Sequence, residues 1–192
     1  TMGIVTAAYA FGAATSPALF VHAMGFGGFQ AAMLGLAIVL MAVSVICLVL
    51  LNKSKAAYKS QARQASAAGV PKTDVMLLWL GYGGGVACGL MAIGHAAGIA
   101  TSLDYSGAIW IAPAVIAVSN LGGSLLAGRL ADAVSSVGLL LGLPFLSAVG
   151  VTVLAITADV DLLLVCFAVI GFSYGGIIAA YPAVIAKMFG VL

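Results

Sequence analysis

The sequence predicts an all-α integral membrane protein with six transmembrane helices. Of its 192 residues, 64% are hydrophobic, and only seven basic and five acidic residues carry charge. Water-soluble domains carry about a quarter of their residues as charged types, so this composition excludes a soluble globular domain. The charges also gather in a few short stretches, which leaves uncharged runs of the roughly 20 residues that a spanning helix needs.

The apolar runs, read between polar or turn-rich breaks, predict six spans. They lie near residues 3–23, 28–51, 75–100, 106–130, 135–157 and 162–186. The connections between the spans are short except for segment 52–74, which holds five of the seven basic residues. Within it Lys55, Lys59 and Arg63 recur every four residues. A short surface helix would turn these three toward anionic headgroups; the alternative is a solvated tether with no specific partner.

The positions of Lys and Arg predict the orientation, because basic loops remain on the cytoplasmic side of a membrane. If linker 52–74 is cytoplasmic, both chain ends are cytoplasmic too, and Arg129 and Lys187 emerge on the same side. The opposite ends of the spans carry no Lys or Arg, only His22, Asp104, Asp159 and Asp161. We therefore expect a multi-pass protein of the cell (inner) membrane with both ends inside.

Small residues recur every four positions on three of the predicted spans, which lets helix backbones approach closely in a membrane. These stripes are Ala8, Gly12 and Ser16; Gly81, Gly85 and Gly89; and Gly171, Gly175, Ala179 and Ala183. Four prolines also lie within spans, where they bend or break helices that line a cavity: Pro17, Pro113, Pro144 and Pro182. A bundle of bent, closely packed helices favours a transporter over a simple anchor.

The stretch at 120–132, Asn-Leu-Gly-Gly-Ser-Leu-Leu-Ala-Gly-Arg-Leu-Ala-Asp, is the most informative motif. Its end, 128–132, resembles the Gly-x-Leu-Ala/Ser-Asp loop motif of the major facilitator superfamily, and its Asn-x-x-Gly lead-in is similar to the oxalate/formate antiporter and monocarboxylate-porter branches. Segments 89–100 and 171–190 resemble the seventh and tenth spans of that branch. In this resemblance Gly128, Arg129 and Asp132 form the gating motif, and Arg129 and Asp132, three apart on one helical face, can pair.

The resemblance also implies a register within a twelve-span carrier. The chain then corresponds to spans five to ten, and the basic linker joins two six-helix bundles. Residues 1–51 give two spans of the first bundle, 52–74 the cytoplasmic linker, and 75–192 four spans of the second bundle, and the remaining spans of the carrier would be partners of this piece. Two departures stand out: Ala133-Val-Ser-Ser136 replaces the basic continuation of the loop motif, and Ser124 stands where the branch commonly has arginine.

The function that the resemblance implies is secondary active transport of a small organic anion, a mono- or dicarboxylate, by alternating access. A coupled proton or counter-anion and the lipid bilayer are the other expected partners. An ionisable residue within the membrane is a functional candidate by default, which singles out His95; its alternative role is a neutral side chain with one hydrogen bond near the outer interface. We expect five residues to face the substrate cavity: His95, Asn120, Ser124, Tyr82 and Tyr174.

Two other classes of protein also fit parts of the sequence. Gly171-Phe-Ser173-Tyr-Gly175 matches Gly-x-Ser-x-Gly, so an intramembrane serine hydrolase would use Ser173 with His95, but the hydrolase elbow needs a strained strand-to-helix turn. A six-helix protein that dimerises to complete a pore is the third possibility. No phosphate-binding loop, metal-ligand cluster or nucleic-acid groove is present in the sequence, and we expect neither a cofactor nor enzyme activity.

Overall fold

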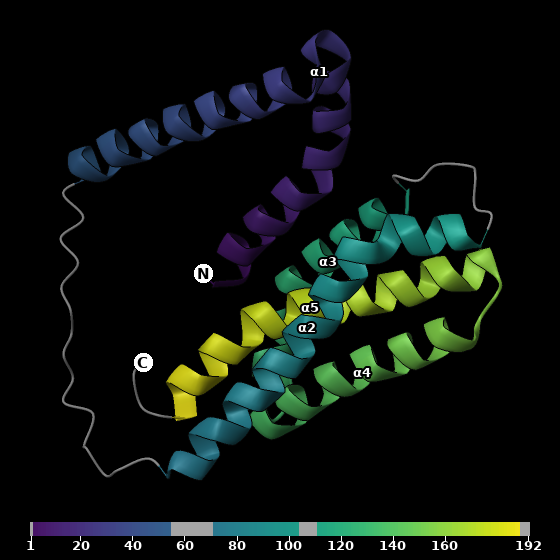
Figure 1. Ribbon diagram of the computed structural model, residues 1–192. Helices are drawn as coiled ribbons and strands as arrows, with labels where there is room; N and C mark the ends of the chain where they lie inside the picture. The colour runs from purple at the N-terminus through teal and green to yellow at the C-terminus, as the bar shows by residue number, and fades with distance from the viewer. Residues whose placement is uncertain (1, 55–70, 104–110, 189–192) are drawn as a thin grey trace. The chain divides into compact units, whose positions relative to one another are not determined.

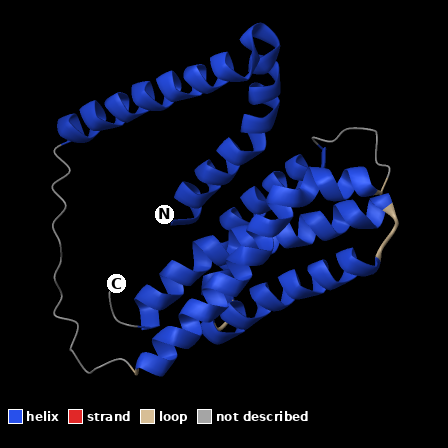
Figure 2. Ribbon diagram, viewed as in Figure 1, coloured by secondary structure: helices blue, strands red, loops and turns tan. Residues whose placement is uncertain are grey.

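The computed structural model describes residues 2–54, 71–103 and 111–188, and these residues form helices and short connections with no strand among them (Figure 2). The helices are α1 (Met2–Ser54), α2 (Lys72–Ser102), α3 (Ile111–Ala133), α4 (Ser136–Ile156) and α5 (Val160–Met188) (Figure 1). This confirms the all-α fold class. The predicted surface helix through Lys55, Lys59 and Arg63 lies outside the described residues.

Helix α1 is interrupted at Gly27 and Gly28, so the described residues contain six helical segments, as predicted. Gly28 has φ 74° and ψ −174°, a region that essentially only glycine adopts. A Cβ on Gly27 would lie 2.7 Å from the Cβ of Ala31. Both positions of the break therefore require glycine, and the break falls at the predicted boundary between spans 3–23 and 28–51.

The chain divides into two compact units, one of residues Ser16–Gln64 and one of Thr1–Thr15 with Ala65–Leu192. Within the first unit the rings of Phe20 and Phe29 meet edge to face across the break, with centroids 6.2 Å apart. Four described helices are long and apolar enough to cross a membrane: Ala18–Lys53, Lys72–Ser102, Ser136–Ile156 and Val160–Ile185. A fifth, Ile111–Ala127, is apolar but shorter.

Helix α5 is the centre of the second unit and contacts α2, α3 and α4 (Figure 1). Two clusters of buried side chains lie along it. One surrounds Ile177 and Tyr181, together with Leu139 and Leu143 of α4. The other surrounds Phe167 and Ile170, together with small residues of α2 and Ile116 of α3.

The predicted glycine stripe of α5 packs against the backbone of α3. A Cβ on Gly171 would overlap the carbonyl of Ile116, and one on Gly175 would overlap the carbonyl of Asn120. In return, Gly123 of α3 lies against the carbonyl of Phe172. Glycines on both helices thus bring the two backbones into direct contact, which confirms the packing role inferred from the spacing.

The glycine stripe of α2 faces larger side chains of α5. Gly89 lies under the ring of Tyr174, and a Cβ on Gly85 would come within 2.7 Å of Ile177 Cδ1. A Cβ on Gly81 would lie 3.1 Å from the hydroxyl of Tyr181. This stripe, too, is a helix-packing face. The third stripe stays a prediction, since a Cβ on Gly12 would meet nothing within 4 Å among the described residues.

Candidate functional site

Two of the five predicted site residues form a polar pair between α3 and α5. The side chains of Asn120 and Ser124 are 1% and 0% exposed. Ser124 Oγ lies 3.4 Å from Asn120 Oδ1 and 3.2 Å from the carbonyl oxygen of Gly175, to both of which it is placed to donate. The four-residue spacing puts both side chains on one face of α3, and Gly175 lets that face approach α5. The pair therefore joins the two helices in the conformation described here.

The amide nitrogen of Asn120 has no hydrogen-bond partner among the described residues. A buried polar group without a partner costs about 1–3 kcal/mol, and in a membrane interior no bulk water is present to supply one. Asn120 Nδ2 is thus a buried donor without an acceptor, next to the hydrogen bond between Ser124 and Asn120 Oδ1.

Tyr174 lies on the α2 side of α5, one residue before the glycine that accepts from Ser124. Its side chain is buried and its ring covers Gly89 of α2. Tyr174 and the Asn120–Ser124 pair therefore occupy the same level of α5 on two of its faces. The structure brings these three predicted residues to one depth of the bundle.

The other two predicted residues lie on α2, to either side of the level of Gly89. His95 is six residues after Gly89 and Tyr82 is seven before it, which at 1.5 Å per residue corresponds to about 9 Å and about 10 Å along the helix. His95 is exposed. Tyr82 is half-buried and packs on Tyr181 with ring centroids 5.4 Å apart. A small anion cannot contact both residues at once.

The gating motif occupies the end of α3. Arg129 is exposed, and the side chain of Asp132 lies outside the described residues, as does the environment of Gly128. The Arg129–Asp132 pair accordingly stays a prediction.

Two buried serines, Ser147 of α4 and Ser173 of α5, are not among the five residues predicted to face the substrate cavity. Ser147 and Ser173 are both 0% exposed, and neither Oγ has a partner in the described part of the chain. A Cβ on Gly176 would lie 3.0 Å from Leu143, and a Cβ on Gly150 would lie 2.9 Å from Ile170. Because α4 and α5 are antiparallel, these two contacts place Ser147 opposite Ser173. Sequence reasoning had no signal for this register.

The position of Ser173 also bears on the hydrolase alternative. It lies in the middle of the continuous helix α5, not at a strand-to-helix turn, and its hydroxyl is not hydrogen-bonded to a histidine. A serine nucleophile requires a base within hydrogen-bond reach. Neither element of a serine hydrolase is present at this residue.

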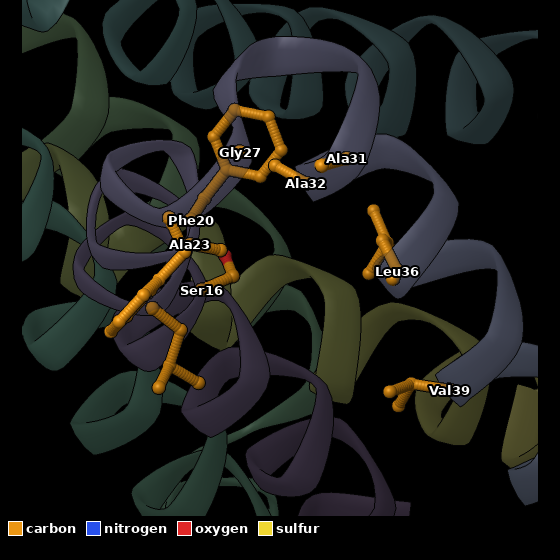
Figure 3. Close-up of a pocket in the computed structure, with 11 residues that line it drawn as sticks. Ser16, Phe20, Ala23, Gly27, Ala31, Ala32, Leu36 and Val39 are labelled. Atoms are coloured by element: carbon orange, nitrogen blue, oxygen red, sulfur yellow. The ribbon is translucent and has the colours of Figure 1, made fainter.

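A cavity of about 740 Å³ lies within the first unit, between the two arms of the broken helix α1 (Figure 3). Phe20 and Ala23 line it from one arm, and Ala32, Leu36 and Val39 line it from the other. Its lining residues include no ionisable group. The cavity therefore offers an anionic substrate no charged partner. Among the described residues there is also no group of three His, Cys, Asp or Glu side chains that could hold a metal ion.

Long apolar helices, backbone contacts at glycines and buried polar side chains define a multi-pass membrane protein of the helical-bundle class. The family model of the Major Facilitator Superfamily matches residues 1–191, so the chain belongs to this family of membrane transporters. No curated protein and no solved structure matches the chain significantly.

Proposed function

We propose that this chain serves secondary active transport of a small organic anion, a mono- or dicarboxylate, as part of a larger carrier that works by alternating access. Membership of the Major Facilitator Superfamily supports transport as the activity. In such carriers two helical bundles move around a site near the membrane midplane. A coupled proton or counter-anion drives the cycle.

The assignment of an anionic substrate is supported by the amide nitrogen of Asn120, which lies beside Ser124 and has no hydrogen-bond partner among the described residues. A carboxylate oxygen is the acceptor that this donor lacks, and such charge-assisted hydrogen bonds are stronger than neutral ones. Since Asn120 is 1% exposed, substrate reaches it only when α3 and α5 move apart. The contacts of Gly123 and Gly171 at this interface involve backbone rather than interlocked side chains, which suits such a movement.

We assign different roles to the remaining residues because of their spacing. Tyr174, at the level of Asn120, lines the substrate site. His95, exposed about 9 Å further along α2, exchanges the coupled proton, for which histidine is suited near neutral pH. Tyr82 lies toward the Lys72 end of α2 and borders the site on that side.

The charged residues at the ends of the helices have two further roles, in the gate and in the orientation of the chain. Arg129 at the end of α3 pairs with Asp132 as the gate of the second bundle. Linker 52–74 and both chain ends lie on the cytoplasmic side, where the basic residues meet anionic lipid headgroups.

The test is uptake of radiolabelled lactate, formate and oxalate by proteoliposomes that contain the complete carrier. We expect uptake of at least one of the three above empty liposomes, and an Asn120→Ala variant to lose most of it. Gly122→Ala is the matched control, since it lies two residues away on α3 and its Cβ would meet nothing within 4 Å. Absence of uptake of all three anions by the unmodified carrier would refute the anion assignment.

A further inference from the structure

The carbonyl group of Leu140 loses its normal partner because of a proline one turn later. In an α-helix the carbonyl of residue 140 accepts from the N–H of residue 144, but Pro144 lies inside α4 and has no N–H to donate. Leu140 is buried. In a membrane interior such a freed backbone group must be satisfied by a neighbouring helix, a side chain or an ordered water.

Tyr181 of α5 supplies the missing donor. Its hydroxyl donates to the Leu140 carbonyl oxygen at 3.0 Å, and its side chain is only 3% exposed. Its ring also packs on Tyr82 of α2, with centroids 5.4 Å apart. One side chain thus completes the hydrogen bonding of α4 while it packs on α2.

We propose that Tyr181 is a positioning residue for transport, because its hydroxyl holds α4 straight against α5 at the point where Pro144 lets α4 bend. This inference rests on the proposed function. While the Tyr181–Leu140 bond is made, the segment of α4 before Pro144 is tied to α5. When the bond opens, no backbone hydrogen bond from residue 144 resists a tilt of that segment, and the α4 segment moves relative to α2 and α5.

Proline is the reason that this bond matters more than an ordinary tyrosine hydrogen bond. Thr152 Oγ1 donates at 2.8 Å to the carbonyl of Ala148 on the exposed face of the same helix. That carbonyl also has the N–H of Thr152 in the regular helical pattern, so the hydroxyl adds a second bond to a group that is already satisfied. At Leu140 the regular helical donor is missing because residue 144 is proline, and the Tyr181 hydroxyl takes its place.

The experiment is a double-mutant cycle read by amide hydrogen exchange, using the complete carrier in detergent. Tyr181→Phe keeps the ring and removes the donor, and we expect it to speed exchange of the amides at 141–148 by about fivefold, the factor for one ordinary intramolecular hydrogen bond. Pro144→Ala restores an N–H to residue 144. In that background we expect Tyr181→Phe to change exchange by less than about twofold, since the Leu140 carbonyl retains a donor. Thr152→Val is the matched control and should leave these amides unchanged.

Transport kinetics separate a positioning role from a purely structural one. We expect Tyr181→Phe to alter the maximal rate of oxalate, formate or lactate uptake and to leave KM unchanged, with Thr152→Val altering neither. Equal effects of Tyr181→Phe with and without Pro144, or an altered exchange pattern with unchanged uptake kinetics, would overturn the inference. Failure of the proposed function has a different signature: the unmodified carrier takes up none of the three anions, while the exchange cycle still reports on Tyr181 and Pro144.

Discussion

Gly123 of α3 lies directly against the carbonyl group of Phe172 in α5. A Cβ added to Gly123 would also lie 3.1 Å from the amide nitrogen of Gly176. The adjacent Gly122 has nothing within 4 Å of its own Cβ position. Two consecutive glycines of one helix therefore differ completely in their surroundings. Only Gly123 is needed for the contact between α3 and α5.

We expect Gly123→Ala to destabilise the protein by about 1–3 kcal/mol, the usual cost of overpacking a tight interface, because the atoms in its way belong to backbone and cannot rotate aside. Gly122→Ala should change the thermal midpoint by little. Both variants can be compared by thermal unfolding in the same detergent. Equal midpoints for the two variants would contradict the close backbone contact.

Ser124→Ala tests the polar pair between α3 and α5. The change removes the hydroxyl that is placed to donate to the Gly175 carbonyl and to Asn120 Oδ1. Neither the oxygen nor the nitrogen of the buried Asn120 amide then has a partner among the described residues. Hydrogen bonds between membrane helices contribute about 0.6–1.7 kcal/mol, and we expect a loss toward the upper end. Ser44→Ala is the control, since Ser44 is exposed and donates at 2.8 Å only to the Leu40 carbonyl of its own helix. A loss no larger than that of Ser44→Ala would mean that the pair does not join the helices.

The helices were largely predictable because long apolar runs and the breaks between them are local features. The boundary at Gly27 and Gly28 separates two such runs, and the glycine stripes of α2 and α5 follow directly from four-residue spacing. Which helix each stripe meets is not local. No feature of the sequence predicts that Gly89 packs against Tyr174 of α5 rather than against a residue of α3 or α4.

The candidate site was predictable for the same reason only in part. Asn120 and Ser124 share a helix and a face, so their proximity follows from spacing, and the structure places them together. Tyr181 was missed because its role depends on Leu140 in another helix. From the sequence, Pro144 predicts that the carbonyl of residue 140 lacks its helical donor. The sequence does not predict which residue replaces that donor, because Tyr181 is 41 residues away.

The opposition of Ser147 and Ser173 predicts a disulfide when both are replaced by cysteine. We expect Ser147→Cys with Ser173→Cys to cross-link on mild oxidation, because the register set by Gly150 and Gly176 brings α4 and α5 together there. A disulfide needs Cα atoms closer than about 7 Å. The three native cysteines, Cys47, Cys88 and Cys166, are free and must first be replaced by alanine.

The control pair for this cross-link is Thr152→Cys with Ser173→Cys, since Thr152 lies on the exposed face of α4. Mobility on a gel before and after reduction measures the cross-link. Efficient cross-linking of the control pair, or none for residues 147 and 173, would contradict the helix register described here.

His95→Ala tests the proton role proposed for the exposed histidine of α2. A protonated imidazole carries positive charge, which favours an anion, and histidine is suited to proton exchange. We therefore expect His95→Ala to lower uptake and to weaken its dependence on pH. The measurement is initial uptake of labelled oxalate, formate or lactate at several pH values.

The chain contains one other histidine, which makes a matched control. His22 packs edge to face on Phe26, with ring centroids 4.9 Å apart, next to the break in α1. If proton exchange belongs to His95, His22→Ala retains the pH profile of the unmodified carrier while His95→Ala flattens it. Profiles that are equally steep in both variants would remove His95 from the coupling step, because the titrating group would then lie elsewhere in the carrier.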